Sequence, residues 1–171
     1  MGGSIHRVTG IFRRSSPRSQ QDPSDKEKET MPRTDLDVLE TICQRISLNI
    51  PDHCPWRWDK EFNLALTVID RQDEIMVELP MTLEFTNKWD FTSIDDADGP
   101  IRDFFQAGLG IIPGQKVFTM EPVNGVVLYA AWWPWGDEER ISLRLGLVSI
   151  SGEKLDPADV KSLICRWLKL T

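Results

Sequence analysis

Tryptophan is the residue type in this chain with the greatest capacity for specific contacts. Seven tryptophans occur among 171 residues, and three of them lie in the run AWWPWG at 131–136. An exposed tryptophan buries a large area with few rotamers, is enriched at interface hot spots and offers a flat face for stacking. Large core side chains are the alternative interpretation of the same residues. The candidate partner-binding residues are Trp56, Trp58, Trp132, Trp133 and Trp135.

The two adjacent tryptophans of that run are expected to separate. Neighbouring side chains on a strand point to opposite faces, so Trp132 and Trp133 should face opposite sides of a sheet. We expect one of them to pack in the core and the other to face outward. Trp56, Trp58 and Trp135 are expected to be the most exposed of the five candidates.

The sequence contains few residues that could act as nucleophiles or metal ligands, with two histidines and three cysteines. His53 is the one histidine of residues 34–171, and it lies beside Cys54 in the segment PDHCP at 51–55. Adjacent residues in an extended segment point in opposite directions, so His53 and Cys54 are not expected to pair for catalysis. Three cysteines without a CxxC motif indicate neither a disulfide framework nor a zinc site, and they favour a reducing compartment. We predict no catalytic residue, no metal and no cofactor.

The glycine-rich segment at 108–114 does not match a phosphate-binding loop. Pro113 stands where a dinucleotide-binding fingerprint needs its third glycine. Gln115 separates the last glycine from Lys116, which excludes a P-loop. The segment is therefore interpreted as the end of a helix and the turn that follows it.

The acidic segment at 95–99 resembles a calcium loop only in part. In that register Ile94 and Phe105 would occupy two ligand positions, and neither side chain can coordinate calcium. A solvated loop and a helix cap are the preferred interpretation. Acidic residues are abundant throughout the chain and no pair stands out, so an enzyme without a recognisable signature remains open.

Alternating and helical patterns predict the first half of the folded part. A helix is expected from Thr34, with an apolar stripe over 36–46. Alternation over 61–68 and again over 75–85 predicts two antiparallel strands, the second with one face in water. Pro80 on the polar side of the second strand indicates an edge position or a bend.

The second half is predicted from stronger turn and cap signals. A loop over 87–98 leads into a short helix that begins near Asp98. Asn124-Gly125 predicts a type I′ hairpin that joins 115–122 to 126–133, and a further strand covers 141–147. Asp156 and Pro157 begin the last helix.

The element order is α-β-β-α-β-β-β-α, which predicts an α+β fold. We expect a mainly antiparallel sheet of five or six strands, with N-terminal, middle and C-terminal helices packed on it. Residues 1–33 are expected to be a disordered basic leader, and residues 34–171 a single domain.

Residues 1–33 and residues 34–171 also differ in net charge. Seven basic and four acidic residues give residues 1–33 a charge of +3, so the total of −7 places −10 on residues 34–171. A body this acidic repels phosphate backbones, which argues against nucleic acid as a partner. No apolar run approaches 18 residues, so we expect no membrane span and a cytoplasmic protein. The alternative is an organelle transit peptide, because residues 1–21 hold four arginines and no acid.

Residues 34–171 resemble type III secretion chaperones and related small bacterial α+β proteins. The likeness is carried by size, acidity, the first helix (Leu36 to Ile46), the hairpin-rich middle and the last helix (Val160 to Leu168). It rests on pattern, because the family has no diagnostic motif. The strand order departs from the family, which usually places three strands before the middle helix and two after it.

The resemblance implies a non-catalytic chaperone or adaptor that acts as a homodimer. Its partner would be a protein, either an extended segment or a basic protein. The alternative function is a carbohydrate- or small-ligand-binding module that uses exposed tryptophans. A third possible function is an enzyme without a recognisable sequence signature.

Overall fold

The computed structural model describes residues 33–170, with side chains from Leu36 onward, and contains one sheet of six strands. The spatial order is β1-β2-β6-β5-β4-β3, and every neighbouring pair is antiparallel. This confirms the predicted α+β class and antiparallel sheet. The predicted leader lies outside the described residues, except for Arg33. The strands are β1 (Arg57–Asp59), β2 (Leu64–Asp70), β3 (Asn87–Asp90), β4 (Lys116–Thr119), β5 (Val126–Pro134) and β6 (Arg140–Ser149).

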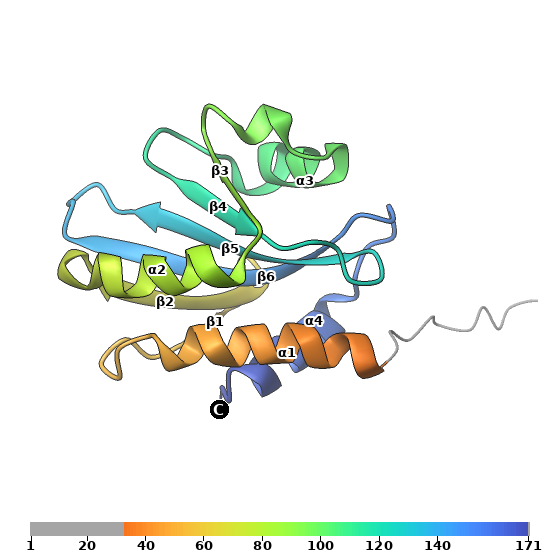
Figure 1. Ribbon diagram of the computed structural model, residues 1–171, viewed down its shortest axis with the longest axis horizontal. Helices are drawn as coiled ribbons and strands as arrows, with labels where there is room; N and C mark the ends of the chain where they lie inside the picture. The colour runs from red at the N-terminus through yellow and green to blue at the C-terminus, as the bar shows by residue number, and fades with distance from the viewer. Residues whose placement is uncertain (1–32, 171) are drawn as a thin grey trace, which may run out of the picture. The chain divides into compact units, whose positions relative to one another are not determined.

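Four helices cover the sheet from two sides (Figure 1). The helices α1, α2 and α4 pack together on one face, and α3 lies over the other face. A π-helical turn, Phe105–Leu109, extends α3. None of the described helices has the length and apolar character needed to cross a membrane. The helices are α1 (Arg33–Leu48), α2 (Glu74–Glu84), α3 (Gly99–Phe104) and α4 (Pro157–Trp167).

The central strand β5 is buried on both of its faces. Trp132 belongs to the core beneath α1, α2 and α4, whereas Trp133 belongs to the core beneath α3. The two side chains therefore separate as predicted, but neither faces outward. The expectation of an outward tryptophan is wrong because a second helical layer covers the far face of the sheet.

The segment 75–85 was predicted as a strand, and the structure shows a helix over most of it, α2. Apolar residues at every second position can also fit a helix, because two residues turn the helix by about 200°. The alternation then divides into two i, i+4 rows on opposite sides, with Val77 and Met81 buried and Ile75 and Leu79 exposed. Pro80 lies inside this helix and not at a strand edge.

The segment 87–98 was predicted as a loop, but its first four residues form the edge strand β3. β3 pairs with β4 through a register that includes Trp89 opposite Val117. Trp89 donates its indole N–H to Thr119 Oγ1 at 2.9 Å, which fixes this edge strand to its neighbour. The signal was weak because β3 has only four residues, three polar and one tryptophan, so it shows no apolar alternation.

Turn and cap signals gave the most accurate local predictions. Asn124 and Gly125 have φ values of 49° and 74°, as a type I′ hairpin requires. Asp156 Oδ1 accepts a hydrogen bond from the Ala158 N–H at 2.8 Å, and Pro157 is the first residue of α4. Both features depend on a few neighbouring atoms, so local sequence is enough to specify them.

A tyrosine ring packs closely against a glycine where the two central strands β5 and β6 pair. Tyr129 on β5 lies opposite Gly146 on β6. The Tyr129 ring lies against Gly146 and also packs against Phe104 and Phe105, whose ring centroids are 5.4 and 5.1 Å from its own. A glycine is needed at 146 because the ring occupies the space that a Cβ would fill.

Gly146→Ala is expected to destabilise the fold by about 1–3 kcal/mol, because the added methyl overlaps the phenol ring in a filled core. Urea unfolding followed by tryptophan fluorescence measures the change. Gly136→Ala is the matched control, since a Cβ at that position meets nothing within 4 Å. Equal stability of the two variants would contradict this account of the β5–β6 contact.

Candidate protein-interaction site

Helix α2 is attached to the rest of the fold through its acidic residues. Glu74 pairs with Arg71 at 2.8 Å at its beginning, and Glu84 pairs with Arg45 of α1 at 3.3 Å at its end. Arg71 precedes the helix directly, whereas Arg45 lies on the neighbouring helix. Both pairs turn the carboxylates of α2 towards groups of the same chain.

Glu78 forms the central attachment of α2 to the sheet. Its Oε1 accepts hydrogen bonds from Lys88 Nζ on β3 at 2.8 Å and from Lys116 Nζ on β4 at 2.7 Å. Burial acts to raise the pKa of Glu78, but the hydrogen bonds from Lys116 and Lys88 outweigh it, and the pKa lies below its usual value. The charged carboxylate therefore connects the helix to two strands at one edge of the sheet.

The side of α2 that faces away from the core is apolar and exposed. Four of its side chains have exposed fractions between 59% and 82%, although all belong to types that normally lie inside. They follow the spacing i, i+1, i+4 and i+8, which places them along one side of the helix. We call this surface the α2 apolar face, and it consists of Ile75, Met76, Leu79 and Leu83.

The α2 apolar face is electrically neutral in an acidic molecule. Each glutamate of the helix, Glu74, Glu78 and Glu84, is paired with a basic group of the same chain. The carboxylates are therefore compensated, and none needs a partner on the exposed side. A helix that is apolar on both sides is typical of a buried element, so the exposure of this side is unusual.

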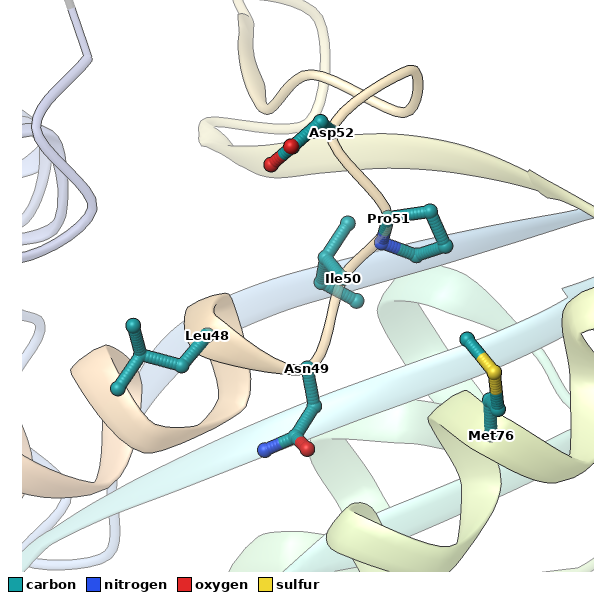
Figure 2. A pocket seen from close by; sticks show the side chains of 6 residues that line it. All are labelled: Leu48, Asn49, Ile50, Pro51, Asp52 and Met76. Carbon is teal, nitrogen blue, oxygen red and sulfur yellow. The ribbon is translucent and has the colours of Figure 1, made fainter.

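A shallow depression extends the α2 apolar face towards α1 (Figure 2). It lies where α1 ends and α2 begins, and its wall includes Leu48, the most exposed large apolar side chain of the described residues. Asp52 is the one carboxylate in the wall. The depression therefore lacks the paired carboxylates that an acid–base hydrolase would need. Its lining residues are Leu48, Asn49, Ile50, Pro51, Asp52 and Met76.

The predicted tryptophans do not gather into one surface. Trp132 and Trp133 are buried, and Trp56 and Trp58 are half-buried against the core beneath α1 and α4. Only Trp135 counts as exposed, at 37%, and the guanidinium of Arg140 lies 4.0 Å above its ring centroid. A tryptophan platform for a sugar is thus not formed by these five residues.

The face of Trp133 is occupied by a side chain of the protein itself. The Arg144 guanidinium lies 4.1 Å from its ring centroid and 5.5 Å from that of Phe62. Arg144 donates to Ser142 Oγ at 3.2 Å, while its Nε is buried without a partner. Burial lowers the pKa of Arg144, and the carboxylate of Asp59 opposes that shift. This arrangement fills the sheet face beside α3.

The sequence did not indicate the α2 apolar face because the segment was interpreted as a strand. In that interpretation Ile75, Leu79 and Leu83 share the core face with Val77 and Met81. Helix propensity was the available contrary signal, because Glu, Met and Leu dominate the segment and are good helix formers. Tertiary contacts were still needed to show which row is covered.

Family models, curated proteins and solved structures were compared with the chain, and none matches it.

Glu78→Gln is expected to lower the free energy of unfolding at pH 7 by about 1 kcal/mol, since a partly buried charged acceptor becomes neutral. The folded-state pKa of Glu78 is lowered, so its contribution is present above the unfolded value of 4.5. It is lost as the pH falls through the folded value. The difference between wild type and variant should therefore shrink in acid, which urea unfolding at pH 7 and pH 3 measures.

Glu121→Gln is the matched control for this substitution. Glu121 is an exposed glutamate after β4, and its replacement removes the same formal charge. A loss of stability at Glu121 equal to that at Glu78 would show that net charge, and not the lysine contacts, causes the effect.

Proposed function

We propose that this protein is a non-catalytic protein-binding chaperone or adaptor that acts as a homodimer. The observation that carries the proposal is the α2 apolar face, which exposes four large aliphatic side chains without a net charge around them. The largest apolar patch of a typical monomer covers about 300–600 Å² and is often functional. The α2 apolar face, with Leu48 in the depression beside it, is therefore a candidate for such a functional patch.

A second copy of the chain is the occupant that best fits the α2 apolar face. Residues 34–171 carry −10, so two bodies repel each other wherever unpaired acids meet. The α2 face avoids this repulsion because its glutamates are paired within the chain. In a two-fold contact between antiparallel helices, Leu79 near the middle meets its own copy, and Ile75 meets Leu83 of the other chain.

A protein partner would then bind at the remaining open parts of the sheet. Helices cover both faces of β5, but β1 and β3 form the two edges and leave backbone groups available. An extended segment can add to such an edge through main-chain hydrogen bonds. The acidity of residues 34–171 favours a segment with basic residues.

Leu79→Arg is expected to convert the dimer to a monomer while the chain stays folded. The side chain is 59% exposed, and arginine is a good helix former, so α2 itself should remain intact. Two arginines would meet near the two-fold axis and repel each other. Light scattering coupled to size exclusion, over a range of concentrations, measures the molar mass, and circular dichroism reports the fold.

Ile112→Arg is the matched control, because Ile112 is similarly exposed at 61% but lies in the loop between α3 and β4. It should leave the dimer unchanged. A wild-type monomer at all concentrations would overturn the homodimer, and so would a Leu79→Arg protein that dimerises like the wild type.

The partner is tested by affinity capture from the native host with wild-type protein as bait. The expected result is a captured protein whose bound segment is basic and extended, mapped by protection from proteolysis. A strict monomer that captures no protein would overturn both parts of the proposal.

A further inference from the structure

The segment 51–54 is a turn and not the extended segment that the sequence suggested. The Cys54 N–H donates to the Pro51 carbonyl at 2.8 Å, and this closes the turn. The donor atoms of His53 and Cys54 consequently lie on the same side, within 4.8 Å of each other and of an Asp73 oxygen. Adjacent residues can share a site here because the backbone reverses between them.

The turn is held against the sheet by a buried hydrogen bond. Thr67 on β2 donates its hydroxyl to the Cys54 carbonyl at 2.8 Å. Cys54 is buried, whereas His53 is exposed. The Cys54 thiol is therefore held in the interior, whereas the His53 ring lies at the surface.

Asp73 directs a carboxylate oxygen towards the His53 ring of this turn. It is the residue before α2, where an aspartate normally accepts a hydrogen bond from the first turn of the helix, yet its side chain makes no such bond. Its Oδ2 is shielded from solvent and accepts no hydrogen bond. The His53 Nε2 atom lies 3.3 Å from this oxygen.

A second carboxylate lies at the open side of the same cluster. Asp70 ends β2, and its Oδ2 is 3.9 Å from His53 Nε2. Asp73 follows Asp70 by three positions, and the short 3-10 turn Arg71–Asp73 brings both carboxylates to the histidine. The cluster therefore combines one nitrogen, one sulfur and two carboxylate groups from two separate segments of the chain.

We propose that His53, Cys54 and Asp73 bind a divalent transition-metal ion of the zinc type, with Asp70 as the fourth ligand. Zinc takes imidazole, thiolate and carboxylate in tetrahedral sites, at about 2.3 Å from sulfur and about 2.0 Å from nitrogen or oxygen. These lengths place the ligand atoms roughly 3.3–3.8 Å apart. The donor atoms of His53, Cys54 and Asp73 lie within 4.8 Å of one another, so a bound ion would have to draw them closer, and the exposed His53 side chain has room to move.

The mixed donor set separates this site from those of calcium and magnesium. Both of those ions prefer oxygen ligands alone, and Ca²⁺ takes six or more of them. A thiol and an imidazole beside the carboxylates suit a softer ion. The charge also favours a cation, since two carboxylates and a thiolate would supply three negative charges around a divalent ion.

The proposed ion would connect the turn at 51–54 to the beginning of α2. This contact lies beside the depression lined by Asp52 and Met76. The proposal does not depend on the homodimer, because all four ligands come from one chain.

Zinc binding to the reduced full-length chain, measured by calorimetry, is expected to show one ion per chain. Co²⁺ is expected to give the visible bands of a tetrahedral site and a thiolate-to-metal charge-transfer band. Cys54→Ser should remove the charge-transfer band. His53→Ala and Asp73→Asn should each weaken zinc binding by at least about tenfold, because each removes a ligand.

Cys165→Ser and Asp52→Asn are the matched controls, since each removes a comparable group that is not part of the described cluster. They should leave zinc affinity and the cobalt spectrum unchanged. His53 is exposed and Asp73 half-buried, so these two variants test the site even where Cys54→Ser fails to fold. No zinc binding by the wild type, or affinity that both variants retain, would overturn the proposal.

Discussion

The fold depends on the burial of its central strands, β5 and β6, from both sides. A sheet covered on both faces needs helices in two layers, and the chain supplies α1, α2 and α4 for one face and α3 for the other. Trp132 and Trp133 illustrate this constraint, because adjacent residues of one strand each fill a different core. Large apolar side chains at neighbouring positions are stable here only because water is excluded from both faces.

This arrangement places α2 at the boundary between core and solvent. Val77 and Met81 complete the core beneath it, and Glu78 connects it to the edge strand β3 and its neighbour β4 through Lys88 and Lys116. The helix is thereby fixed in rotation, and its second apolar row points outward. The exposed row is a consequence of an attachment that uses every carboxylate of the helix on the inner side.

The same attachment brings the beginning of α2 close to the turn at 51–54. Asp73 lies where β2 gives way to the helix, and Thr67 of β2 holds the carbonyl of Cys54. The position of α2 thus governs both the apolar face and the cluster of potential ligands. The contacts that hold the two ends and the middle of α2 thus set the position of both the α2 apolar face and the His53–Cys54–Asp73 cluster.

The sequence by itself determined the features that depend on neighbouring residues. The hairpin at Asn124-Gly125, the start of α4 at Asp156 and the short helix after Asp98 follow from turn and cap chemistry, and the α+β class follows from their order. Tertiary structure alone decided whether 75–85 is a strand or a helix, because apolar residues at every second position satisfy both geometries. It also decided that Trp132 and Trp133 are buried and that His53 and Cys54 lie beside Asp73, since burial and the packing of the 51–54 turn against β2 depend on segments distant in the chain.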